Sequence, residues 1–167
     1  MLILGIDPGT ATTGYGFLRV EDGVYEAVDW GLIETSKDNH PAKRLHNIHI
    51  QMKQLLNDMM PDVIVIERLF FARNAKTAMK VSQSVGVMLF TTHETEAEVF
   101  EYAPMTIKKV ISGNGRADKK EMQKSLRKVL GAKVRSKARK KTHFDNAADA
   151  LAVALCHAYT INGYKKE

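Results

Sequence analysis

The feature that most constrains the fold is a short apolar run, Val63-Ile64-Val65-Ile66, which lies between Pro61-Asp62 and Glu67. Consecutive β-branched residues favour an extended strand. A strand without a polar face is typical of the centre of a sheet that is buried on both sides. The sequence therefore predicts a sheet with other elements packed on both of its faces.

The remaining sequence supplies these elements. Turn signals at Asp7–Thr10 and Glu21–Gly23 separate the first strands into an antiparallel meander. The predicted strands are Leu2–Ile6, Thr13–Val20, Val24–Thr35, Asp62–Glu67 and Glu98–Tyr102. Periods near 3.6 predict helices over Ala42–Met60, Asn74–Thr92, Thr106–Ser112, Lys119–Leu130 and Asn146–Thr160, with a basic loop over Val134–Lys141. This order predicts a single α/β domain over residues 1–167. It resembles the ribonuclease H-like fold, a five-stranded mixed sheet flanked by helices on both faces.

The basic residues are unevenly distributed. The net charge of the chain is +6, but Met105–Thr142 carries fourteen Lys/Arg and two Asp/Glu, whereas the rest carries eleven basic and seventeen acidic residues. A basic segment of this kind indicates an acidic polymer such as nucleic acid as a partner, although a solvated helical face would give the same composition. No apolar stretch is long enough for a membrane span. The single cysteine and the absence of a signal-peptide pattern lead us to expect a cytoplasmic protein without disulfides.

Three carboxylates stand where strands end or a helix begins. Asp7 follows the first strand, Glu67 closes the fourth, and Asp149 lies early in the last predicted helix. Sites in sheets of this kind form beyond the strand ends. Asp145 and Asn146 precede Asp149 by four and three residues, so all three share one helix face. If that face meets the strand ends, several oxygen ligands converge.

Such a cluster suits divalent cations. Two like charges ~4 Å apart repel by about 4 kcal/mol at an effective dielectric constant of 20, and a cation removes this cost. Mg²⁺ prefers oxygen ligands and keeps positions open for water and phosphate. Two ions about 4 Å apart can activate a water and stabilise a leaving oxygen, which is the chemistry of phosphodiester hydrolysis.

Each acid also has a simpler interpretation. Asp7 could belong to a turn, and Glu67 could be an exposed strand end. Either Asp145 or Asp149 could cap the last helix, and for Asp145 the N-cap is the preferred interpretation. His143 is a possible further ligand, but a DNA-facing or structural role is favoured for it.

Several motifs, in order along nearly the whole chain, resemble those of the RuvC family of Holliday-junction resolvases. The first is Ile3–Thr10 followed by Thr13-Gly14-Tyr15-Gly16, which alone is only moderately specific. The others are Ile66–Phe70 followed by Asn74, Tyr102-Ala103-Pro104, Lys108, Gly113–Lys119 and Ala147–Ala152. Together they are highly specific.

The resemblance implies an endonuclease that resolves four-way DNA junctions during recombination and repair. It implies a homodimer that makes paired nicks, one per subunit, with Mg²⁺ as cofactor, Mn²⁺ able to substitute and two ions per site. The helix after the fourth strand, Asn74–Thr92, is the expected dimer contact, and its small residues are compatible with this. The family works beside the RuvA–RuvB branch-migration complex, which is therefore an expected partner.

Residue by residue, Asp7, Glu67 and Asp149 match three of the family's four acidic positions. The fourth lies three residues before Asp149 and is usually Asp or His, whereas this chain has Asn146. An amide oxygen can ligate Mg²⁺ but carries no charge. Asn146 is then a weak natural ligand, or Asp145 substitutes for it after a small helix rotation, or the chain is an inactivated junction-binding variant.

The resemblance assigns Phe70 to stacking on an unpaired base near the junction centre, although one of Phe70 and Phe71 is expected to belong to the core. Arg73, Asn74, Lys76 and Lys80 are expected to contact DNA along the same groove. Lys108 and Lys119 match functional lysines of the family. Lys109, Arg116 and Lys120 are expected to hold backbone phosphates, which sets affinity rather than sequence choice.

Three rival functions remain at this stage. Asp7-Pro8-Gly9-Thr10 also resembles the phosphate loops of actin-like kinases and ATPases, but these need two such domains and 167 residues are too few. A non-catalytic junction-binding protein would nick nothing in Mg²⁺. Another ribonuclease H-like nuclease, for example one that processes ribosomal RNA, would prefer RNA over a junction.

Overall fold

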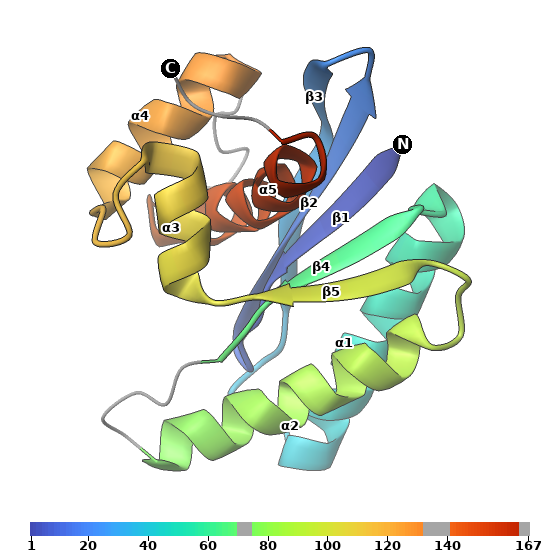
Figure 1. Ribbon diagram of the computed structural model, residues 1–167. Helices are drawn as coiled ribbons and strands as arrows, with labels where there is room; N and C mark the ends of the chain where they lie inside the picture. Colours follow the sequence, from blue (N-terminus) through green and yellow to red (C-terminus); the bar gives the residue numbers. More distant parts are fainter. Residues whose placement is uncertain (70–74, 132–140, 164–167) are drawn as a thin grey trace.

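Five strands form one mixed sheet in the order β3-β2-β1-β4-β5 (Figure 1). The computed structural model describes residues 1–69, 75–131 and 141–163. The strands are β1 (Leu2–Asp7), β2 (Thr12–Glu21), β3 (Val24–Glu34), β4 (Val63–Glu67) and β5 (Glu98–Tyr102). The first three pair antiparallel through short turns, whereas β4 and β5 continue the sheet parallel to β1. The mixed sheet predicted from the sequence is confirmed.

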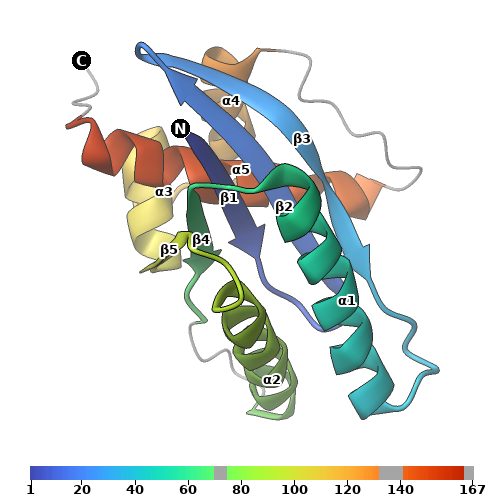
Figure 2. The ribbon, with the colours of Figure 1, turned by 90° about the vertical axis from the view of Figure 1, so that its right-hand side faces the viewer.

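Helices cover both faces of this sheet. On one face lie α1 (Pro41–Met59) and α2 (Ala75–Thr92); on the other lie α3 (Pro104–Ser112), α4 (Lys119–Leu130) and α5 (Lys141–Ile161) (Figures 1 and 2). The apolar run of β4 serves both layers. Ile64 and Ile66 join the core under α1 and α2, and Val63 and Val65 join the core under α5. All four are buried, as their pattern predicts.

Helix α5 lies directly on the sheet because β1 and β2 carry glycine beneath it. A Cβ atom on Gly5 would collide with the backbone of Ala150 and Ala154, and one on Gly14 would collide with the backbone carbonyl of Asn146. Such contacts would force the helix away from the strands, since neither backbone can give way cheaply. These two glycines therefore set how closely the residues of α5 approach the strand ends.

The start of the last helix was predicted wrongly. The helix begins at Lys141, five residues before the predicted Asn146, so Asp145 lies inside it and is not the N-cap. The polar residues before the alanine-rich stretch resemble a helix N-cap. A helix can also contain such residues, however, on a face that is not packed against the rest of the protein. The predicted basic loop loses Lys141 to this helix, and residues 134–140 lie outside the described part of the chain.

Cys156 is buried on α5, and burial raises the pKa of its thiol to about 12, which makes the thiol a poor nucleophile at neutral pH. In the three described segments, no helix combines the length and the apolar character that a membrane crossing needs.

Candidate active site

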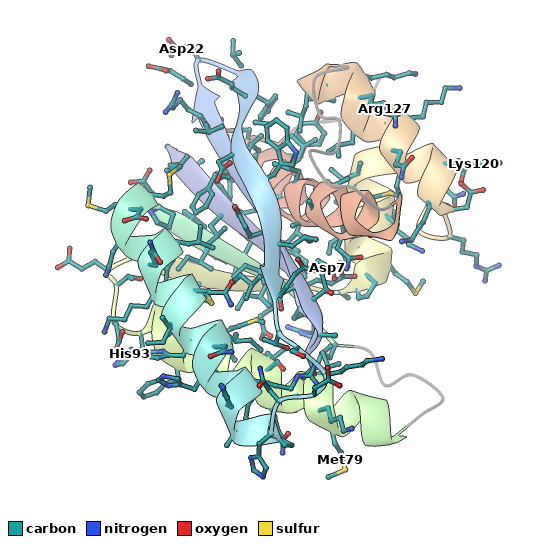
Figure 3. The ribbon with its side chains drawn as sticks, turned by 180° about the vertical axis from the view of Figure 1, so that it is seen from behind. Asp7, Asp22, Met79, His93, Lys120 and Arg127 are labelled. Atoms are coloured by element: carbon teal, nitrogen blue, oxygen red, sulfur yellow. The ribbon has the colours of Figure 1, made fainter. Side chains whose placement is uncertain are left out.

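The parallel pairing of β1 with β4 brings two carboxylates together. Ile6 lies opposite Ile66 in this pairing, so Asp7 and Glu67 leave neighbouring strands at the same edge of the sheet. Figure 3 shows Asp7 at the end of its strand, toward the side covered by α5 and α3. Because the segments that follow the strands diverge beyond this edge, both side chains lie in the open space beyond the strand ends.

A third carboxylate and two lysines come from the helices on this face. Asp149 belongs to α5, which packs closely on Gly5 in β1 and Gly14 in β2. Lys119 is the first residue of α4, and its Nζ lies 3.7 Å from Oδ2 of Asp149. A capping box fixes the start of α4: Asp118 accepts a hydrogen bond from the backbone of Glu121, and the Glu121 carboxylate accepts one from the backbone N–H of Asp118. Lys108 comes from α3.

These five charged side chains line one cavity of about 150 Å³. Its remaining walls are mostly apolar and come from α3, α4 and α5. They are Pro104, Ile107, Met122, Ala152 and Val153. Apolar walls lower the local dielectric response, so charges that meet here act on one another more strongly than they would in water. The acids enter from the strand ends and α5, and the lysines from α3 and α4.

Burial and the neighbouring acids favour a protonated carboxyl in this cavity. Burial, followed by the charges of Glu67 and Asp149, raises the pKa of Asp7 from its ordinary 3.8 to about 8. Burial also raises the pKa of Glu67. A hydrogen bond between the two carboxyls raises the pKa of Asp7 and lowers that of Glu67, so Asp7 carries the proton that they share. Lys119 and Lys108 partly offset the repulsion.

The three carboxylates are suitable ligands for a divalent cation. In this structure, however, two of them share a proton and the third is paired with a lysine. Among the described residues, no three acidic, histidine or cysteine side chains are placed so that they could hold a metal ion as they stand. In this arrangement Asp7 is hydrogen-bonded to Glu67, and Asp149 is paired with Lys119. Rotation of these side chains would expose carboxylate oxygens, the ligands that Mg²⁺ and Mn²⁺ prefer.

Other predicted site residues lie outside this cavity. Asn146 is half-buried on α5 but does not line it. Lys109, Arg116 and Lys120 are exposed on neighbouring segments, and Lys120 points outward from α4 in Figure 3. Phe70, Arg73 and Asn74 lie outside the described residues. His143 and Asp145 fall within α5, but their side chains are also outside the described part.

Sequence reasoning missed two features of the site. It did not place Lys119 against Asp149, since that pair depends on how α4 crosses α5. It also missed the apolar walls, which come from residues that look like ordinary core in the sequence. The only available signal was the capping sequence Asp118–Glu121, which fixes where α4 begins.

Comparison with known proteins places this chain in a family. Residues 3–157 match the family described as crossover junction endodeoxyribonuclease RuvC. A relative with that name from Syntrophomonas wolfei is 41% identical over 160 residues, which cover 96% of this chain and 90% of the relative.

Two solved structures support the same relationship. Thermus thermophilus RuvC in complex with a Holliday junction substrate has a TM-score of 0.86 at 30% identity and covers 98% of this chain and 96% of its own. Another structure of T. thermophilus RuvC has a TM-score of 0.83 at 32% identity, with 98% and 97% covered. They confirm the predicted ribonuclease H-like fold. The chain belongs to the RuvC family of crossover junction endodeoxyribonucleases, a family of metal-dependent nucleases.

Proposed function

We propose that this chain is a metal-dependent endodeoxyribonuclease that resolves four-way DNA junctions by paired nicks. The observation that carries the proposal is the cavity in which Asp7, Glu67 and Asp149 meet Lys108 and Lys119. Membership of the RuvC family supports the reaction, and the related T. thermophilus protein, whose complex holds a Holliday junction, supports the substrate. Neither the structure nor the comparisons favour the inactive alternative.

In this proposal the acids hold the metal and the lysines hold the phosphate. Asp7, Glu67 and Asp149 would bind Mg²⁺, or Mn²⁺ in its place, with Asn146 as a neutral fourth ligand. Two bound ions would supply an activated water and stabilise the leaving 3′-oxygen. Asp7 and Glu67 would give up their shared proton as the ions bind. Lys108 and Lys119 approach from the helix side, where they can stabilise charge that builds on the scissile phosphate.

Surrounding residues would hold the DNA. The exposed Lys109, Arg116 and Lys120 are placed to bind backbone phosphates beside the cavity. Phe70 would stack on an unpaired base, with Arg73 and Asn74 nearby. The stacking role of Phe70 rests on the family resemblance. His143 and Asp145 stay possible additional ligands.

We also propose a homodimer through α2. Its exposed surface carries Phe90, which is 67% exposed, and Leu89, together with the small exposed residues Ser82 and Gly86. Apolar side chains beside small ones allow two helices to approach closely. A two-fold axis at this surface would present two identical cavities to two strands of a junction. The single domain over residues 1–167, the cytoplasmic location and the RuvA–RuvB partner stay predictions.

The proposal is tested with a mobile four-way junction in Mg²⁺ and in EDTA. We expect paired nicks in Mg²⁺, none in EDTA, and far slower cleavage of linear duplex and RNA. Asp7→Asn is expected to bind the junction but to lose cleavage by several orders of magnitude. Junction binding without any nicking by the unaltered chain would favour the junction-binding alternative, and preferred cleavage of RNA would favour a different ribonuclease H-like activity.

A further inference from the structure

A second cavity, of about 470 Å³, lies between α1, α2 and the segment that joins β3 to α1, and Thr10 in the loop after β1 also lines it. We propose that it binds a backbone phosphate of the junction DNA next to the strand that is cut. The proposal rests on the proposed function, because it assumes that DNA reaches the end of β1. It assigns a role to Arg44, a residue to which the sequence patterns give none.

Three cations and no acid are among the described residues that line the cavity. The cations are Lys37, Arg44 and Lys80. Within the described part of the chain, none of these three cations forms a salt bridge. The nearest acid in sequence, Asp38, accepts a hydrogen bond from Ser36 and is not part of the wall. An uncompensated group of positive charges favours an anion.

Arg44 is held in place by a chain of hydrogen bonds. Its Nε donates to Oγ1 of Thr35 at 3.0 Å, and that hydroxyl donates to the backbone carbonyl of Thr10 at 2.6 Å. From α2, the fully buried Ser84 donates to Oγ1 of Thr10 at 3.2 Å. The Nε bond is the only hydrogen bond of the Arg44 side chain to the described residues, so both terminal nitrogens stay available. A fixed guanidinium with two free amino groups matches the oxygens of a phosphodiester.

The position of Thr10 connects this cavity to the active site. Thr10 follows Asp7 by three residues and lines the second cavity, whereas Asp7 lines the first. A DNA strand that crosses the loop after β1 could therefore place one phosphate between the acids and lysines and another against Arg44. The floor formed by Leu45 and Met79 is apolar, which suits the carbon atoms of a deoxyribose.

The test compares charge-removing variants at equal net charge. Arg44→Gln and Lys80→Gln are made at the cavity, and Arg19→Gln serves as the control. Arg19 pairs with Glu26 on the exposed β2–β3 hairpin, whose tip at Asp22 lies at the opposite end of the molecule from Met79 in Figure 3. Junction affinity is measured in EDTA over a series of salt concentrations, so that cleavage does not interfere. Lys80 is exposed and its removal should not disturb folding, which keeps the test valid if Arg44→Gln is unstable.

We expect about a tenfold weaker junction affinity for Arg44→Gln and a smaller loss for Lys80→Gln. The slope of log K against log salt should fall in magnitude by about 1 for each variant. Arg19→Gln should match the unaltered chain. Equal affinity and slope in all three variants would overturn the proposal.

A further arm distinguishes DNA from a free anion. If inorganic phosphate stabilises the chain against heat only when Arg44 is present, and the DNA slope is unchanged, the cavity is a small-anion site and the proposal fails. Failure of the unaltered chain to bind or nick a junction would instead remove the proposed function.

Discussion

At the scale of residues, the site is a cluster of three acids whose charges repel one another. Asp7 and Glu67 share a proton, and Asp149 is paired with Lys119. In both arrangements a proton or a lysine offsets the carboxylate charge that a metal ion would offset if it were bound. The position of each acid at a strand end was evident in the sequence, but the shared proton was not, because it depends on burial and on distances between strands that are sixty residues apart.

The raised pKa of Asp7 predicts that the metal-free fold loses stability as pH rises. The folded chain keeps the Asp7 proton up to about pH 8, whereas the unfolded chain releases it near pH 4. The folded state binds more protons in this window, so its free energy of unfolding falls between about pH 4 and 8. Asp7→Asn removes the ionisable group and should flatten this dependence. It should also raise the melting temperature at pH 8, by ~2–4 °C for each kcal/mol gained.

This prediction is checked by thermal unfolding from pH 5 to pH 8 in EDTA. Asp58→Asn, an exposed acid on α1, removes the same charge and should behave like the unaltered chain. A parallel pH profile for Asp7→Asn and the unaltered chain would show that Asp7 ionises normally.

Asn146 allows a second test at this scale. We expect Asn146→Asp to retain or raise Mg²⁺-dependent cleavage, because a carboxylate holds the ion more strongly than an amide oxygen does. The rate is compared with that of the unaltered chain at several Mg²⁺ concentrations, and the gain should be largest when Mg²⁺ is scarce. A clear loss of cutting would indicate that Asn146 itself is the adapted ligand.

At the scale of elements, the strands were predicted better than the start of the last helix. Strand β4 follows from its β-branched run, and α4 agrees with its prediction because a capping sequence precedes it and glycine follows. Helix α5 was predicted too short because Asp145 before an alanine-rich run resembles a cap. The cavity beside Arg44 could not be predicted from any single element, because Thr35 follows β3 whereas Arg44 lies in α1 and Ser84 in α2.

The close packing of α5 on β2 gives a prediction about Gly14. In Gly14→Ala the new methyl group would meet the backbone carbonyl of Asn146 and displace the part of α5 that carries Asp149. We expect cleavage to fall by at least tenfold and stability to fall by about 1–3 kcal/mol. Both are measured by junction nicking and by denaturant unfolding. Gly31→Ala is a suitable control, because its methyl group would meet the movable end of the Tyr15 side chain. Its loss should be smaller, and equal losses would contradict this account.

At the scale of the whole molecule, the two faces of the sheet have different roles. The face covered by α3, α4 and α5 holds the acids and lysines of the first cavity, and the face covered by α1 and α2 carries the exposed apolar surface (Figure 2). Paired nicking needs two active sites in a fixed relation. The described residues form one cavity that holds the acids, so a second active site would come from a second copy of the chain. Association through the α2 surface would keep the acidic cavities of both copies open.

The dimer proposal predicts that Phe90→Glu yields a monomer. A charge placed on an apolar contact between two copies of α2 costs several kcal/mol at the interface, since each copy brings an unpaired carboxylate. Light scattering should show half the mass. Val24→Glu is the matched control, because Val24 is also exposed, at 65%, but lies on the β2–β3 hairpin.

The same variants separate association from chemistry. On a plasmid with an extruded cruciform, a dimer cuts both strands in one binding event and gives linear product, whereas a monomer gives nicked circles. Phe90→Glu should therefore accumulate nicked circles while each nick still requires Mg²⁺, and Val24→Glu should give linear product. If Phe90→Glu stays dimeric and linearises the plasmid, the two chains meet through another surface, because an interface centred on α2 could not tolerate two buried carboxylates facing each other.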